Sequence, residues 1–366
     1  MSMPPYHHTI LVSAVADGFV FEFNPSRVIF GRGTRSQADI ELERLGVSRA
    51  MVLSTPAQAN LAGEFAREIG DRAAVVHSGA VMHTPIEITE AAIRVAQSIR
   101  ADGILSVGGG SAIGLGKAIA LRTDLPQLAV PTTFAGSEMT PILGQVENGV
   151  KTTLRTPKVL PETVIYDPDL AMTMPPAFFG PSGMNAMAHA VEALYARDAN
   201  PVTSLMAEES LRALGRALPW IRTRPDDAEA WTVAVYGAWL AGSCLGTVGM
   251  ALHHKICHTL GGAFDLDHAG LHCLMLPYSV AYNRDAAPEA MQRASRALGV
   301  SDTPAGLYDL MLELGTSKSL REFGLTESDL EQAADLAVIN PYDNPRPVTR
   351  DAVLRMLRAA YHGTPP

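Results

Sequence analysis

Six polar side chains lie at helical spacing inside otherwise apolar segments of the chain. They form three pairs, each four residues apart: Asn185 and His189, His254 and His258, and His268 and His272. Residues four apart lie on one face of a helix, so each pair presents its polar groups in one direction. A single buried histidine is most simply a core residue with a hydrogen-bond partner. A cluster of imidazoles facing a cleft instead favours proton transfer near neutral pH or metal binding.

Three of these imidazoles, His189, His254 and His268, would bind a divalent metal if a carboxylate completed the set. The position that would supply the carboxylate is Asn185, whose neutral amide is a poor ligand. We therefore expect no metal at this site.

A second stretch with chemical meaning runs from Ile104 to Lys117 and indicates a short apolar strand, a glycine turn and a helix. The turn contains Gly108, Gly109, Gly110 and Ser111. Glycines let backbone amides approach an anion, and the unpaired N–H groups of a first helical turn add partial positive charge. The stretch therefore predicts a pyrophosphate site for a dinucleotide. A tight connection that binds nothing is nearly as consistent, because the glycines do not follow G-x-G-x-x-G and no acidic residue lies about 20 positions on.

Short strands alternate with helices up to Tyr166. Strands are predicted at 28–30, 50–53, 73–76, 104–107, 128–130 and 163–166, with intervening helices that include 57–69 and 88–100. This alternation predicts a parallel sheet covered on both faces, whose ligands bind beyond the carboxyl ends of the strands. The candidate cofactor-binding residues follow those ends: Ser54, Thr55, Gly79, Gly108, Gly109, Gly110, Ser111, Thr132, Thr133 and Ser137.

Helical periodicity prevails from Ser182 onward. Helices are predicted at 183–195, 202–218, 229–260, 287–298, 303–314, 327–337 and 350–361, with Gly261 and Gly262 ending the third. The sequence thus predicts an α/β dinucleotide-binding domain at 1–171 and a helical substrate-binding and catalytic domain at 172–366. We expect the cofactor cleft between them.

Composition argues against several classes of function. With 366 residues, 47% of them hydrophobic, a net charge of −9 and no run of basic residues, the chain is an ordinary globular protein and nucleic acid is not an expected partner. The three cysteines form no C-x-x-C pair and no apolar signal core begins the chain, so we expect a reduced, cytoplasmic protein. The uncharged stretch Ala230 to Leu252 is long enough to span a bilayer, but glycines interrupt it, and a buried helix is the better interpretation.

Several segments together resemble the iron-containing alcohol dehydrogenase superfamily, whose members share a nucleotide-binding α/β half and a helical metal-binding half. The matching features are the Gly-Gly-Gly-Ser turn followed by Lys117, the segment 131–138, the Asp167-Pro168 corner and the spacing of His254, His258 and His268. Within the superfamily the chain most resembles the maleylacetate reductases, through segments 80–83, 131–141, 185–196 and 252–262. The resemblance implies a Rossmann-like parallel-sheet domain followed by a helical domain, the dehydroquinate synthase-like fold.

Two positions resemble the branch of this superfamily that works without metal. Asn185 replaces an aspartate of the metal-dependent dehydrogenases, and Gly114 stands where they carry an acidic residue. The segment 266–272 departs from the maleylacetate reductase pattern, Leu-Pro-His-Ala-Glu-Thr-His, and Tyr278 replaces a later histidine. We expect Asp267 to repel a dicarboxylate, and the changes at 270 and 271 to alter the pocket rim.

The resemblance implies reduction of the C=C bond of 2-maleylacetate, or a substituted analogue, to 3-oxoadipate in the degradation of aromatic compounds, with NADH or NADPH. It implies that residues 108–111 hold the pyrophosphate and that Thr132, Thr133 and Ser137 flank the nicotinamide. The residues that it implies for the chemistry are His254, His258 and His268, supported by His189, Asn185 and Lys255. Lys255 is equally consistent with a solvated residue at a helix C-terminus.

No acidic residue ends the second strand, so Ser54 and Thr55 predict the use of both NADH and NADPH. Relatives of this kind are often dimers, and we expect a homodimer. Two alternatives stay open. One is a metal-dependent alcohol dehydrogenase of the same fold, and the other is a non-redox lyase or cyclase descendant with an altered pocket.

Overall fold

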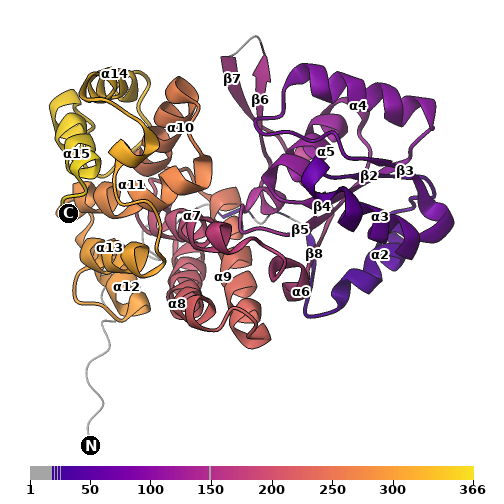
Figure 1. Cartoon of the computed structure of the whole chain (residues 1–366), viewed down its shortest axis with the longest axis horizontal. Helices are drawn as coiled ribbons and strands as arrows, with labels where there is room; N and C mark the ends of the chain where they lie inside the picture. The colour runs from indigo at the N-terminus through magenta and orange to yellow at the C-terminus, as the bar shows by residue number, and fades with distance from the viewer. Residues whose placement is uncertain (1–18, 20, 23, 25, 148–149) are drawn as a thin grey trace, which may run out of the picture.

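The computed structural model describes residues 19, 21–22, 24, 26–147 and 150–366. They form an α/β half and a helical half that lie side by side (Figure 1). The last strand of the main sheet ends at Tyr166, and helices follow it to the C-terminus. The predicted fold class is confirmed, whereas the domain boundary after residue 171 stays a prediction.

Six parallel strands form the main sheet in the order β1-β8-β5-β4-β2-β3. They are β1 (Arg27–Phe30), β2 (Ala50–Leu53), β3 (Ala73–His77), β4 (Gly103–Gly108), β5 (Gln127–Pro131) and β8 (Thr163–Tyr166). Successive side chains point to opposite faces. Val52 accordingly packs with α2 (Ala38–Arg44) and α3 (Ala59–Glu68), and Met51 packs with α4 (Ile86–Ser98) and α5 (Gly110–Thr123). Helices therefore cover both faces, as the alternation predicts.

A second sheet, of two antiparallel strands, is absent from the sequence-based prediction. It consists of β6 (Ile142–Glu147) and β7 (Val150–Arg155), which project from the α/β half (Figure 1). The overlooked signal is the Asn-Gly pair at 148–149 of the sequence, which is typical of tight hairpins.

The helical half packs around one apolar core in which the middle of α7 is fully enclosed. Its helices are α6 (Pro168–Ala171), α7 (Pro176–Tyr195), α8 (Pro201–Thr223), α9 (Ala228–Thr247), α10 (Leu252–Phe264), α11 (His268–Asn283), α12 (Pro288–Leu298), α13 (Thr303–Glu313), α14 (Glu327–Ala337) and α15 (Arg350–His362). Helix α7 packs against α8, α9 and α11, so its polar residues face other helices instead of solvent.

The structure corrects two predictions around residue 250. The predicted helix 229–260 is two helices, because the backbone is extended at Val248 and the axes of α9 and α10 differ by 93°. Gly261 and Gly262 do not end α10, which continues until Asp265 adopts a left-handed conformation. Each glycine inside a helix is unfavourable by about 1 kcal/mol, and burial of Leu260 and its neighbours outweighs this. His268 then begins α11, a helix that the sequence patterns do not predict.

Among the described residues, no single helix has the length and apolarity to cross a membrane, and the bent pair α9 and α10 passes that test only when taken together. All three cysteines are free thiols and buried.

Candidate active site

Helix α7 places three polar side chains in the interior. Asn185, His189 and Glu192 follow one another at spacings of four and three residues, so they lie along one face of the helix. All three are buried, and Glu192 is fully so. A carboxylate in such a place requires hydrogen-bond donors, because burying an unpaired charge is very unfavourable.

The donors for Glu192 come from the first turn of α10. Its Oε1 accepts a hydrogen bond from the backbone N–H of His253 at 2.7 Å, and its Oε2 accepts from Ala251 N at 3.0 Å. Oε2 also lies 2.6 Å from Nδ1 of His254. Glu192 therefore caps α10 from another helix. It also holds His254 with its Nδ1 proton directed at the carboxylate and its Nε2 lone pair free.

The predicted imidazoles form one contiguous cluster. His189 stacks on His254 with ring centroids 5.1 Å apart, and His254 lies 6.0 Å from His258. His258 stacks on His268 at 6.2 Å, and His268 lies 4.3 Å from His272. The structure thus brings together the five histidines that the sequence singles out, from α7, α10 and α11.

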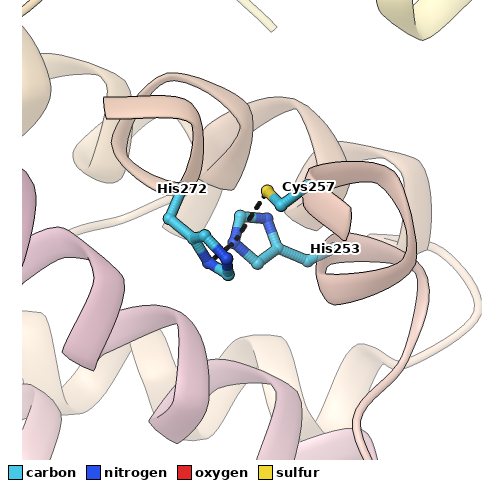
Figure 2. A group of neighbouring side chains, drawn as sticks. All are labelled: His253, Cys257 and His272. Atoms are coloured by element: carbon cyan, nitrogen blue, oxygen red, sulfur yellow. Dashed lines mark hydrogen bonds between the residues drawn. The ribbon is translucent and has the colours of Figure 1, made fainter. Parts of the chain in front are cut away.

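A hydrogen-bonded chain behind the cluster was not predicted. His253 Nε2 lies 2.9 Å from His272 Nδ1 (Figure 2). On the other side of the ring, His253 Nδ1 lies 2.8 Å from Ser279 Oγ. Ser279 donates its own proton to the carbonyl oxygens of Met275 and Leu276, at 3.0 Å each, so its oxygen accepts from His253. His272 then donates from Nδ1 and keeps a lone pair on Nε2.

His253, Cys257 and His272 also have ligand-type atoms within 4.8 Å of one another (Figure 2). The proton shared by the two imidazoles occupies the lone pair that a metal would need. Burial raises the pKa of the Cys257 thiol well above its ordinary value, and nearby Glu192 adds to this, so the sulfur keeps its proton. We therefore interpret this trio as part of the hydrogen-bonded chain.

Burial keeps the inner imidazoles neutral. It lowers the pKa of His189, His253 and His272 well below the ordinary value, and positive charge on neighbouring imidazoles would lower it further. Within this cluster, four buried side-chain atoms have no hydrogen-bond partner among the described residues: Asn185 Oδ1, His189 Nδ1, His254 Nε2 and His272 Nε2. Without a ligand the site therefore has an excess of hydrogen-bond acceptors, which a hydrogen-bond donor or a proton would satisfy.

The donor set does not fit the iron that such a site would hold in a metal-dependent dehydrogenase. A non-haem iron site typically combines two imidazoles with a carboxylate, whereas Asn185 contributes a neutral amide. The nearby carboxylate, Glu192, is occupied by two backbone N–H groups and His254. No anionic ligand is therefore available among these residues.

Lys255 lies in the first turn of α10, so the interpretation of its charge as favourable at a helix C-terminus is wrong. Its Nζ donates to the carbonyl oxygen of Ile339 at 2.8 Å, and burial lowers its pKa. Tyr342 lies in the same loop as Ile339, and its Oη is 3.1 Å from His258 Nδ1. Lys255 and His258 are thus tied to the segment between α14 and α15.

Segment 266–272 and Tyr278, which depart from the maleylacetate reductase pattern, do not all lie at the rim of a pocket. Leu271 and Tyr278 are buried in the core, so the expectation that position 271 alters the pocket rim is wrong. Asp267 caps α11 by accepting a hydrogen bond from Gly270 N at 2.7 Å. A Cβ at Gly270 would lie 3.1 Å from Phe323 Cζ and 2.9 Å from Asp267 Oδ2, so this glycine fits the local packing.

In the α/β half, the predicted strand, glycine turn and helix between Ile104 and Lys117 are present. Helix α5 begins at Gly110 directly after β4, and Gly108 has a φ of 145°. A Cβ at Gly108 would lie 2.5 Å from Gln58 Oε1, and one at Gly109 would lie 2.9 Å from Thr133 Oγ1. The side chains of Gln58 and Thr133 therefore leave no room for a Cβ in the turn, which requires glycine at both positions.

Neighbouring loops converge on this turn. Thr132 N donates to Gly108 O at 3.1 Å, and Gln58 Nε2, which the sequence did not single out, donates to Thr132 Oγ1 at 2.7 Å. Ser54 is fully buried and its Oγ lies 2.9 Å from Ser78 Oγ, so it holds the loop after β3.

The remaining loop residues are less enclosed. Thr55, Gly79, Ser111, Thr133 and Ser137 are half-buried.

The segment 131–141 joins the two halves. Phe134 N donates to Ser182 Oγ of α7 at 3.0 Å, and a Cβ at Gly136 would lie 3.4 Å from the His189 ring. The predicted cofactor loop therefore contacts the imidazole cluster. At Gly114 a Cβ would lie 2.7 Å from Thr84 Oγ1, so an acidic side chain has no room there.

Comparison with known proteins places the chain in a family. Residues 25–168 match the protein family described as "Iron-containing alcohol dehydrogenase". Residues 181–361 match the family described as "Fe-containing alcohol dehydrogenase family, C-terminal". Maleylacetate reductase of Sphingobium indicum is 53% identical, with 95% of this chain and 99% of the relative covered. Maleylacetate reductase of Rhizobium sp. is 51% identical over the same shares.

Solved structures agree. That of maleylacetate reductase from Agrobacterium tumefaciens has a TM-score of 0.92 at 50% identity, covering 95% of this chain and 99% of the other. That of a 1,3-propanediol oxidoreductase has a TM-score of 0.87 at 26% identity, covering 93% and 100%. The chain therefore belongs to the iron-containing alcohol dehydrogenase family, among its maleylacetate reductases.

Proposed function

We propose that this protein reduces the C=C bond of 2-maleylacetate, or a substituted analogue, to 3-oxoadipate at the expense of NADH or NADPH. The observation that carries the proposal is the position of Gly136 in segment 131–141, where an added Cβ would lie 3.4 Å from the His189 ring. The loop that follows the glycine turn in the sheet thus reaches the imidazole cluster. Relatives named maleylacetate reductase, at 45–53% identity over 95% of the chain, support the substrate.

The cofactor supplies a hydride from C4 of its nicotinamide to the alkene carbon β to the ketone. Residues 108–111 hold its pyrophosphate, and Thr132, Thr133 and Ser137 flank its nicotinamide and ribose. The protein must then stabilise the enolate of the substrate and deliver a proton to the α carbon.

The imidazoles supply that proton. Glu192 Oε2, 2.6 Å from Nδ1, holds the His254 ring, and with it the Nε2 atom, in one orientation within the cluster. His258 and His268 offer further N–H donors, and His189, Asn185 and Lys255 support the arrangement. The protonated imidazole becomes neutral when its N–H proton passes to carbon, and solvent restores it.

The reaction proceeds without metal in this proposal, because the donor set offers no carboxylate. A metal-dependent dehydrogenase of the same fold is the alternative, and stoichiometric iron or zinc in the purified protein would favour it. A lyase or cyclase descendant is the other alternative, and failure to oxidise either reduced cofactor with maleylacetate would favour it.

Both cofactors are used in this proposal, since Ser54 and Thr55 offer no carboxylate to repel a 2′-phosphate. A strong kinetic preference for NADH would contradict this.

We also propose a homodimer: β1 pairs only with β8 among the described strands, so one edge of it is open. Light scattering in solution tests the dimer. The three free thiols support a cytoplasmic location.

The decisive experiment follows absorbance at about 340 nm while purified protein is mixed with maleylacetate and NADH. We expect stoichiometric cofactor oxidation with 3-oxoadipate as the product. Oxidation with simple aldehydes but not with maleylacetate would contradict the proposal.

A further inference from the structure

A buried lysine lies beneath the segment that joins the two halves. Lys117, on α5, is fully buried, although lysine is rarely enclosed without partners. Its Nζ donates to Ser137 O at 2.5 Å, to Thr140 Oγ1 at 2.9 Å and to Ile142 O at 2.8 Å. The three protons of the ammonium group therefore each have an acceptor, and all three acceptors lie in residues 137–142, which lead into β6 and include its first residue.

The charge itself has a counterpart in the same segment. Glu138 is buried, accepts a hydrogen bond from Tyr166 Oη at 2.7 Å, and attracts Lys117 electrostatically. Burial lowers the pKa of Lys117 to about 7, and Glu138 acts in the opposite direction. A methionine would fill similar volume without desolvating a charge, so the polar contacts with segment 137–142 are what distinguish lysine at this position.

One helix thus positions two parts of the predicted cofactor site. Gly110 and Ser111 begin α5 at the phosphate turn, and Lys117 lies about 10 Å further along the same axis. The segment that Lys117 holds carries Ser137 and continues to Gly136, which lies against His189.

We propose that Lys117 is a positioning residue of the reduction site. Its ammonium group fixes segment 131–141 to α5, so that the nicotinamide end of the cofactor is held against the imidazole cluster. The inference rests on the proposed use of a nicotinamide cofactor.

The test compares Lys117→Met with Leu115→Ala. Leu115 is buried on the same helix but packs in the core with Met51 and Ile119, so its truncation lowers stability without removing the contacts of Lys117. Binding of NADH to each full-length protein is measured by quenching of intrinsic fluorescence, and thermal unfolding is recorded in parallel. Thr140→Val, which removes one acceptor at constant shape, serves if Lys117→Met does not fold.

We expect Lys117→Met to raise the Kd for NADH by about tenfold and Thr140→Val by about threefold, whereas Leu115→Ala at a similar loss of Tm changes it less than about twofold. We also expect Lys117→Met to raise the KM for NADH more than that for maleylacetate. Equal effects of Lys117→Met and Leu115→Ala on the Kd would overturn the inference and leave only a structural role. If the wild-type protein binds NADH but does not reduce maleylacetate, the proposed substrate is wrong, and the ratio of Kd values still decides the role of Lys117. If the wild type does not bind NADH, both proposals are wrong.

Discussion

Glu192 on α7 and His254 on α10 form a buried pair whose Oε2 and Nδ1 atoms lie 2.6 Å apart. The pair fixes the tautomer of the imidazole, and the same carboxylate accepts the hydrogen bonds of two N–H groups at the start of α10. One side chain thus connects the beginning of a helix to the orientation of a proposed proton donor.

Replacing Glu192 with Gln is expected to impair stability and catalysis together. The amide NH2 would face an N–H group whose hydrogen bond the carboxylate now accepts, and an unsatisfied buried donor is unfavourable by about 1–3 kcal/mol. We expect kcat/KM for maleylacetate to fall at least about tenfold, because the amide no longer holds the His254 ring in one orientation. Urea unfolding and steady-state kinetics measure the two effects. The control is Glu209→Gln on the surface of α8, and a loss of activity as large in the control would contradict the prediction.

His272 offers a test of the hydrogen-bonded chain behind the cluster. His272→Asn keeps a polar atom near the Nδ1 position that contacts His253 at 2.9 Å, whereas His272→Gln keeps one near the Nε2 position. If the Nε2 lone pair serves the site, Gln should retain more activity and Asn more stability. Comparing kcat/KM and the free energy of unfolding for the two variants measures this. The opposite order of activity would show that His272 has no role in the site beyond packing.

Acid should destabilise the protein through its buried imidazoles. Burial holds the pKa of His189, His253 and His272 well below the ordinary value, so below about pH 6.5 the unfolded chain binds protons that the folded chain does not. The free energy of unfolding should therefore fall as pH falls through that range, by up to about 1.4 kcal/mol per pH unit for each residue. Urea titrations at several pH values measure the slope, and His272→Asn should make it shallower. A stability that is flat or rises toward acid would contradict the burial of neutral imidazoles.

Two glycines inside helices, Gly114 on α5 and Gly262 on α10, differ in the space around them and allow a test of the packing at Gly114. A Cβ at Gly114 would lie 2.7 Å from Thr84 Oγ1, whereas a Cβ at Gly262 meets nothing within 4 Å. Gly114→Ala should lower the free energy of unfolding by about 1–3 kcal/mol, as overpacking does. Gly262→Ala should raise it by about 0.5–1 kcal/mol, through higher helix propensity. Equal effects of the two substitutions on the urea midpoint would show that Thr84 moves away freely.

The sequence predicts those elements whose signal is local. The bounds of β2 and α14 agree with the prediction, since an apolar run and an amphipathic repeat define them. Helix α11 was missed because it is buried on most sides between α7, α10 and α13 and therefore shows no amphipathic repeat. The histidine cluster was found because its members recur at helical spacing.

The partners of these histidines could not be found in the same way. Glu192 lies 62 residues from His254 and Ser279 lies 26 residues from His253, and no periodicity links them. Only the fold brings α7, α10 and α11 together. A carboxylate inside an otherwise apolar helix, as Glu192 is, was the one available signal.

In the proposed function, bare imidazoles serve a nicotinamide-dependent reduction with no metal. To test this, NADH oxidation with maleylacetate is measured before and after exhaustive treatment with a strong chelator, together with the metal content of the protein. Asn185→Asp serves as the matched control, because a carboxylate at that position should create a site that retains zinc. We expect unchanged turnover and negligible iron and zinc in the wild-type protein. Loss of turnover on chelation, with recovery when iron or zinc is added, would contradict it.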